Sequence, residues 1–177
     1  MDDKKISKGN VTMAKRISTG GLLIALAVAL SYVEMLLPLA PGIPGIKLGL
    51  ANLVILGSLY IMSIPEVAVI LVARIVLSGL MFSGMSAIIY SLAGGACALA
   101  VMSLIKKTGL FSITGVSIAG GVCHNIGQFM AAAVFLNFKS VVGYLPMLLI
   151  AGALSGTLVG IVGNKISDAL HRKDRKE

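Results

Sequence analysis

The chain has 177 residues, of which 57% are hydrophobic and 12% are charged, and its mean hydropathy is +0.98. These values exclude an ordinary soluble domain and predict a single integral membrane domain, with room for about six spans of roughly 20 residues. The net charge of +8 gathers near the expected ends of spans, so it indicates membrane topology and no nucleic-acid partner.

The predicted elements begin with a basic polar lead at 1–16, followed by a first span at 17–37. A proline- and glycine-rich connection at 38–47 cannot continue a helix. The fold class is therefore an all-α bundle of six transmembrane helices over 17–164, with a charged tail at 165–177. The later spans are expected at 48–62, 65–82, 112–136 and 143–164. Between the third and the fifth, a turn at 83–86 leads into a fourth span that ends near residue 106.

The distribution of the basic residues predicts the orientation of this bundle in the membrane. With the amino terminus inside, twelve Lys and Arg side chains fall on the cytoplasmic side and two, Lys47 and Lys139, fall outside. Arg74 lies within a span. Because cytoplasmic loops carry the excess of Lys and Arg, the chain is expected in the cell membrane with both termini cytoplasmic.

The stretch 119–128 lies inside a long apolar segment, and it is the only place within the predicted spans where three strongly polar side chains fall within five residues: His124, Asn125 and Gln128. On a helix, His124 and Gln128 share a face and Asn125 lies about 100° round from it. Small residues such as Gly120 and Gly121 extend that face. In a membrane, such a face turns towards the protein interior or a wet cavity.

The other polar side chains are expected at similar depths, at ~1.5 Å of rise per residue. Glu34 and Asn52 fall in the outer part of the membrane and Arg74 near its midplane. We therefore predict an outward-facing pocket for a small-molecule substrate. Its predicted lining is His124, Asn125, Gln128, Arg74, Asn52 and Glu34.

Each of these side chains also has a structural interpretation. Arg74 can bind helix-end carbonyls or pair with Glu34 to fix packing, and Glu34 can simply reach interfacial water. His124 can donate a hydrogen bond across helices without touching a substrate. No cofactor or metal is expected, because the only other histidine, His171, lies in the tail and no metal-type cluster or ATP-binding motif occurs.

Two helices carry small residues every fourth position, which lets helix backbones approach closely. One series is Gly152, Gly156 and Gly160, and the other is Gly21, Ala25 and Ala29. Either face can pack within the bundle or against a partner in the lipid membrane.

Three stretches carry a family resemblance: GIKLGLAN at 45–52, RIVLSGLMFSG at 74–84 and GGVCHNIGQ at 120–128. Over 17–164 the chain resembles the Gx transporter family, also catalogued as heptaprenyl diphosphate synthase component I. The resemblance implies a relationship to the S components of energy-coupling factor (ECF) transporters, which have six helices and cytoplasmic termini. It also implies that Ala25 and Ala29 dock on a transmembrane coupling subunit, with separate ATPases, and that 38–47 covers the substrate.

The family's enzyme name is a separate matter. Prenyl chain elongation needs Mg²⁺ held by aspartate-rich motifs, whereas the aspartates of this chain all lie outside the predicted spans, at Asp2, Asp3, Asp168 and Asp174. Catalysis by this chain alone is not expected. Three functional hypotheses remain: an S-component-like binding subunit, a non-catalytic membrane accessory of heptaprenyl diphosphate or quinone synthesis, and a redox partner protein holding a flavin or quinone.

Overall fold

The computed structural model describes residues 3–37, 48–136 and 142–174, and within these ranges the elements are helices joined by short turns. The helix α3 continues directly into a π-helical turn, η1, and a short 3₁₀ turn, η2, precedes the last helix. The elements are α1 Asp3–Leu36, α2 Leu50–Ile61, α3 Ile64–Ser78, η1 Gly79–Ser83, α4 Met85–Thr108, α5 Ile113–Phe135, η2 Val142–Tyr144 and α7 Leu145–Asp174.

Five segments of the described chain are long and apolar enough to cross a membrane, and α2 is a shorter apolar helix. The predicted all-α membrane bundle is therefore confirmed, and the protein is a multi-pass membrane protein. The five segments are Met13–Leu36, Ile64–Ser83, Met85–Thr108, Ile113–Phe135 and Val142–Asp168.

The second helix differs from the span predicted at 48–62. With 12 residues, α2 is only ~18 Å long, whereas a hydrocarbon core is ~30 Å thick, so it crosses little more than half of it. Backbone geometry sets both ends: Gly49 precedes the helix in the left-handed region at φ 76°, and Met62 follows it in extended conformation. Hydropathy alone does not reveal such a limit.

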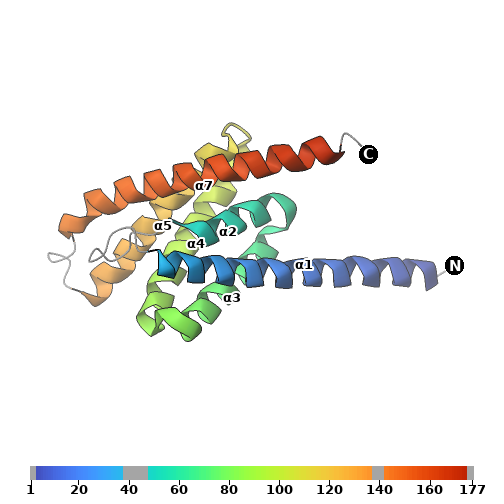
Figure 1. The fold of residues 1–177 in the computed structure, drawn as a ribbon, viewed down its shortest axis with the longest axis horizontal. Helices are drawn as coiled ribbons and strands as arrows, with labels where there is room; N and C mark the ends of the chain where they lie inside the picture. The colour runs from blue at the N-terminus through green and yellow to red at the C-terminus, as the bar shows by residue number, and fades with distance from the viewer. Residues whose placement is uncertain (1–2, 38–47, 137–141, 175–177) are drawn as a thin grey trace.

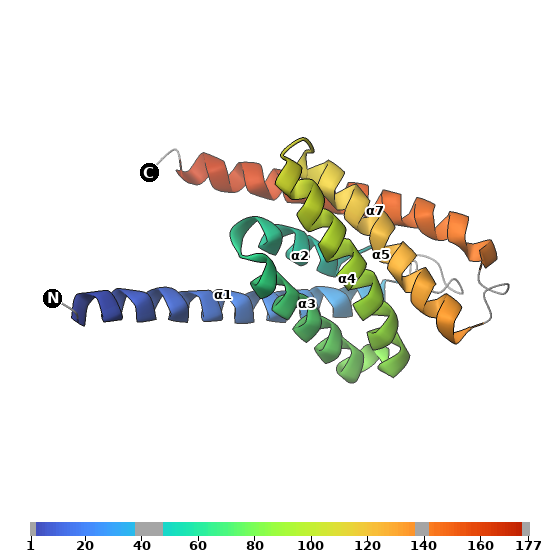
Figure 2. The same ribbon diagram turned by 180° about the vertical axis from the view of Figure 1, so that it is seen from behind.

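The first and last helices also extend beyond the predicted spans. Helix α1 begins at Asp3 rather than at residue 17, and α7 continues to Asp174. The predicted lead and tail are thus largely helical, because a span is recognised by its apolar residues while the helix itself continues into polar ones. Both termini lie at the same end of the molecule (Figures 1 and 2).

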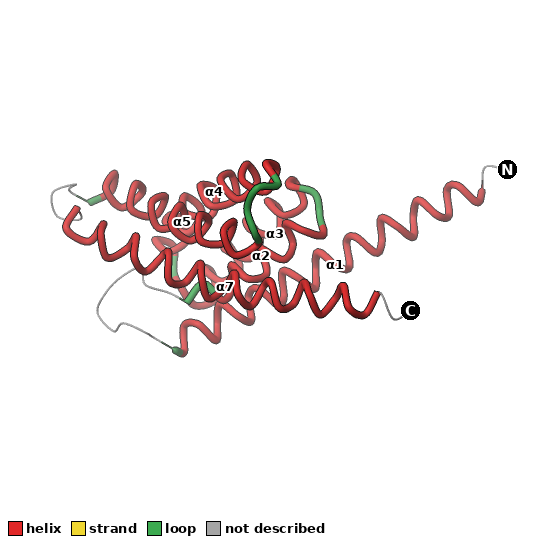
Figure 3. Tube along the Cα trace, turned by 90° about the horizontal axis from the view of Figure 1, so that it is seen from above, coloured by secondary structure: helices red, strands yellow, loops and turns green. Residues whose placement is uncertain are grey.

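Two groups of helices make up the bundle. Helix α5 lies between α4 and α7 and packs extensively on both, as Figure 3 shows, whereas α1 lies mainly against α2 and α3. The short α2 sits at the centre of the hydrophobic core: Leu56 and Leu59 are almost fully buried and belong to one cluster with Ile70 of α3 and Val116 of α5. This central position explains why a helix too short to span is still apolar along most of its length.

Local signals in the sequence place the start of α3. Ser63 and Glu66 form a capping box in which the Glu66 carboxylate accepts a hydrogen bond from the Ser63 backbone N–H at 2.8 Å, and Pro65 occupies the first turn. At the other end, Gly84 adopts φ 85° between η1 and α4, a conformation that glycine adopts readily. The turn at 83–86 was predicted, but the π-helical form of 79–83 was not.

Candidate functional site

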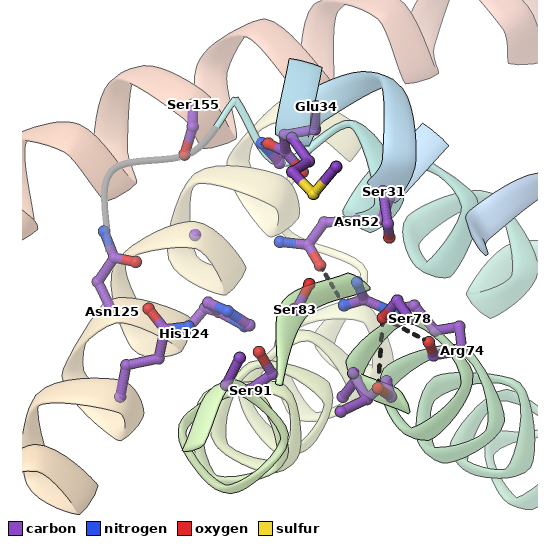
Figure 4. Close-up of a pocket in the computed structure, with 18 residues that line it drawn as sticks. Ser31, Glu34, Asn52, Arg74, Ser78, Ser83, Ser91, His124, Asn125 and Ser155 are labelled. Atoms are coloured by element: carbon purple, nitrogen blue, oxygen red, sulfur yellow. Dashed lines mark hydrogen bonds between the residues drawn. The ribbon is translucent and has the colours of Figure 1, made fainter. Parts of the chain in front are cut away.

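A cavity of about 120 Å³ lies in the half of the bundle away from the termini, and all six helices contribute to its lining. The later parts of α1, α3 and α5 and the earlier parts of α2, α4 and α7 meet there. All six residues of the predicted pocket line this one cavity, shown in Figure 4: Glu34, Asn52, Arg74, His124, Asn125 and Gln128.

Glu34 holds the start of α2 inside the bundle. Its Oε1 atom accepts a hydrogen bond from the backbone N–H of Gly49, the residue that precedes α2. A helix amino terminus carries partial positive charge and unsatisfied N–H groups, so a carboxylate stabilises it. The short helix therefore begins against Glu34, with its first turn beside the cavity.

Arg74 is buried, with 8% of its surface exposed, and its Nη2 atom donates to Asn52 Oδ1 at 2.8 Å. Its Nε atom is buried and has no hydrogen-bond partner in the part of the chain that the structure describes. The direct pair with Glu34 considered from the sequence does not form: among the described ion pairs none joins these two side chains. Asn52 takes that place because it lies between them, in the first turn of α2 (Figure 4).

Close approach of two backbones positions His124 and Gln128. A Cβ atom on Gly94 of α4 would lie 2.6 Å from the His124 carbonyl oxygen, and one on Gly127 of α5 would lie 2.6 Å from the Ala93 carbonyl oxygen. Glycine at both positions lets α4 and α5 cross in contact here. In Figure 4 the His124 ring points into the cavity, and the buried Gln128 Oε1 has no hydrogen-bond partner among the described residues.

Asn125 lines the cavity but also joins two helices. Its Nδ2 atom donates to the Leu148 carbonyl oxygen of α7 at 2.6 Å, and 7% of the residue is exposed. One of its two polar groups is therefore occupied by helix packing. Of the six predicted residues, Asn125 has the clearest structural role.

Five serines of the lining were not predicted. Ser31 stands three residues before Glu34 and Ser78 four residues after Arg74, so helical spacing from a known site residue could have found both. Ser83 reaches the cavity because α3 ends in a π-helical turn, a feature often found at functional sites. The complete set is Ser31, Ser78, Ser83, Ser91 and Ser155.

The two small-residue series lie in different surroundings. Gly152, Gly156 and Gly160 are buried against α5, where a Cβ atom on Gly156 would lie 2.7 Å from the Ser117 carbonyl oxygen. On α1, by contrast, Gly21, Ala25 and Ala29 are exposed, and a Cβ atom on Gly21 would meet no heavy atom of the described residues within 4 Å. The α1 strip thus does not pack inside the bundle.

Some of the predicted features lie outside the residues that the structure describes. The connection at 38–47, expected to cover a substrate, and the outer lysines Lys47 and Lys139 lie outside the residues that the structure describes. Within the described chain, no three or more His, Cys, Asp or Glu side chains form a group that could hold a metal ion.

Comparison with known proteins places the chain in a family. No curated protein and no solved structure matched the chain. The family model described as heptaprenyl diphosphate synthase component I matches residues 23–166, which is more than three quarters of the chain and includes every residue that lines the cavity. This membrane protein belongs to the heptaprenyl diphosphate synthase component I family.

Proposed function

We propose that the chain is a substrate-binding membrane subunit, similar to the S component of an ECF transporter, which captures a small organic molecule for uptake. The observation that carries this proposal is the polar cavity inside an apolar bundle. Glu34, Asn52, Arg74, His124, Asn125 and Gln128 come from four helices, yet they share one cavity. Burying so many polar groups in a membrane protein is costly, so such groups are typically kept for function.

The proposed direction of capture is from outside the cell. The cavity lies in the half of the bundle away from the termini, and twelve of the fifteen Lys and Arg residues would be cytoplasmic if the termini are. In intact cells, an impermeant thiol reagent should then fail to label a cysteine placed at Lys173. Labelling there without lysis would contradict this orientation.

The energy for uptake would come from separate coupling and ATPase subunits, because the chain has no ATP-binding motif. The exposed Gly21, Ala25 and Ala29 offer the coupling subunit a surface with little side-chain volume, on which another helix can lie close. In this proposal the chain itself carries out no catalytic step.

Ligand retention tests the binding role. The full chain is purified in mild detergent, and native mass spectrometry measures the fraction that carries a bound small molecule. Gln128→Ala should lower this fraction, because the loss of a buried ligand contact worth about 1.4 kcal/mol weakens binding about ten-fold. Asn164→Ala, at an exposed position outside the cavity, is the control.

A wild-type protein that retains nothing, or a Gln128→Ala variant that retains as much as the wild type, would contradict the binding role. Asn125→Ala is a poorer test than Gln128→Ala, because Asn125 also bonds α7.

The family description favours a second candidate, a non-catalytic membrane component that holds a soluble prenyl synthase at the membrane through its basic ends. Copurification separates the two. Coupling and ATPase subunits should accompany a transport subunit, whereas a prenyl synthase should accompany the accessory. The flavin form of the redox hypothesis gains no support from the cavity, because about 120 Å³ is too small for a three-ring flavin; a cavity of about 150 Å³ holds a single benzene ring.

A further inference from the structure

The cavity holds two opposite charges that are kept apart. Of the described residues that line it, Arg74 on α3 and Glu34 on α1 are the two that are ionised at neutral pH when unperturbed. Glu34 is bonded to the Gly49 backbone and Arg74 to the Asn52 side chain, and no ion pair forms between the two charges. The lining described here therefore has one positive and one negative end, and no net charge.

Both ends keep hydrogen-bonding capacity for a ligand. The Arg74 Nε atom is buried, donates to no described group, and belongs to a side chain that is 8% exposed. A carboxylate has about four acceptor positions, and the described contact with Gly49 uses one of them on Glu34. Gln128 Oε1, also buried without a described partner, adds a second acceptor. The cavity thus offers a donor at one place and acceptors at others.

This pattern selects the charge of the ligand. An unpaired charge buried away from water is costly, so each ionised end favours a partner of opposite sign. A net anion would pair with Arg74 but add a negative charge beside Glu34, and a net cation would do the reverse. A ligand that carries both signs satisfies both ends. A diphosphate, with several negative charges, does not match a cavity with one arginine and one glutamate.

We propose that the cavity binds a small zwitterion of the α-amino acid type, with its carboxylate on Arg74 and its ammonium group at Glu34 and Gln128. The volume of about 120 Å³ suits this class, since it is close to the space that a single six-membered ring occupies. This ligand class rests on the proposed binding function and narrows it from any small organic molecule to one charge type.

The test uses ligands that share a skeleton and differ in charge. The purified full chain, freed of retained ligand, is titrated with each of the twenty proteinogenic L-amino acids, and the shift in melting temperature is measured. Each amino acid with an uncharged side chain that stabilises the protein is then compared with its 2-hydroxy acid, which is a net anion, and its amide, which is a net cation. Isopentenyl diphosphate is a further net anion.

At least one amino acid should stabilise the protein, and its two analogues should bind at least about ten-fold more weakly. If no amino acid binds, or if a hydroxy acid, an amide or the diphosphate binds as tightly, the proposal is wrong.

Charge-removing variants make the test directional. Glu34→Gln keeps an oxygen that can accept from Gly49 and leaves the cavity positive, so preference should move towards the hydroxy acid. Arg74→Gln keeps a donor for Asn52 and leaves the cavity negative, so preference should move towards the amide. The matched controls, Glu66→Gln and Arg16→Gln, lie outside the cavity and should leave the preference unchanged. Unchanged preference in a folded Glu34→Gln variant would overturn the assignment.

Failure of this ligand class can be told from failure of the binding function. A retained ligand that carries net charge, and is lost in Gln128→Ala, would overturn the zwitterion and leave the binding function standing. Absence of any retained ligand, together with no response to any probe, would overturn both.

Discussion

The buried series on α7 and the exposed series on α1 have the same spacing and opposite surroundings. Gly152, Gly156 and Gly160 bring α7 into backbone contact with α5, whereas Gly21, Ala25 and Ala29 are exposed in the part of the chain that the structure describes. A small residue at every fourth position indicates only that another helix can approach closely. Whether the approaching helix belongs to the same chain depends on where the fold places that face.

The physical consequences of the two faces differ. On α7, van der Waals contact between backbones stabilises the bundle, and any added side chain must displace the opposite helix. On α1, an added side chain extends into lipid or into a partner. Three variants, taken from the largest expected effect to the smallest, test this difference.

Gly156→Leu should have the largest effect. Its Cβ atom alone would lie 2.7 Å from the Ser117 carbonyl oxygen and 2.8 Å from the Ile118 Cα atom, both on the backbone of α5. Overpacking typically costs 1–3 kcal/mol, and we expect the upper end, ~3 kcal/mol, because backbone atoms cannot move aside as side chains do. Thermal unfolding of the purified protein measures the change.

The matched control is Gly21→Leu, which adds the same side chain to the exposed series and should leave the melting temperature nearly unchanged. If both variants melt alike, the contrast between the two faces is wrong.

Ala25→Trp combined with Ala29→Trp tests what the exposed strip is for. The double variant should fold and keep its ligand, because both alanines are exposed. It should lose at least about ten-fold in association with a coexpressed coupling subunit, because two indoles prevent the close helix contact that small residues permit. Copurification and ligand retention are measured on the same preparation.

The control for the indoles is Leu154→Trp with Leu158→Trp, which places the same pair four residues apart on an exposed face of α7. Equal loss of association in both double variants would show that the α1 strip has no particular part in docking.

Asn125→Ala should have the smallest effect on stability. It removes the 2.6 Å hydrogen bond from Nδ2 to the Leu148 carbonyl oxygen within the same α5–α7 interface. Hydrogen bonds between membrane helices contribute about 0.6 kcal/mol on average and up to about 1.7. The melting temperature should therefore fall less than in Gly156→Leu. A larger fall would mean that this polar bond, rather than glycine packing, holds α7 in place.

Much of the cavity could be predicted from the sequence, and the reason is the membrane. Arg74, Glu34 and the His124–Gln128 face are conspicuous because polar groups are rare among apolar residues, and each is costly unless it faces the interior. A six-helix topology with depth along each helix then suffices to bring them to one region. Their ligand-binding role stays a prediction.

The hydrogen bonds within the cavity, and some of the residues that line it, could not be predicted in this way. Arg74 bonds Asn52 rather than Glu34 because α2 starts inside the bundle, and Ser83 enters the cavity because α3 ends in a π-helical turn. Ser91 and Ser155 have no signal in the sequence that separates them from serines elsewhere in α4 and α7. Such contacts depend on displacements of an ångström or two, which hydropathy and spacing do not define.

By itself the sequence determined that the chain lies in a membrane, that it is helical, and which polar residues its interior must contain. These properties follow from the free energy of placing each side chain in lipid. Tertiary structure decided how the helices use their faces: the half-length α2 at the core, the α5–α7 contact through Gly156, and the open strip on α1. The physical reason is that transfer to lipid is a property of single residues, whereas packing depends on which two surfaces meet.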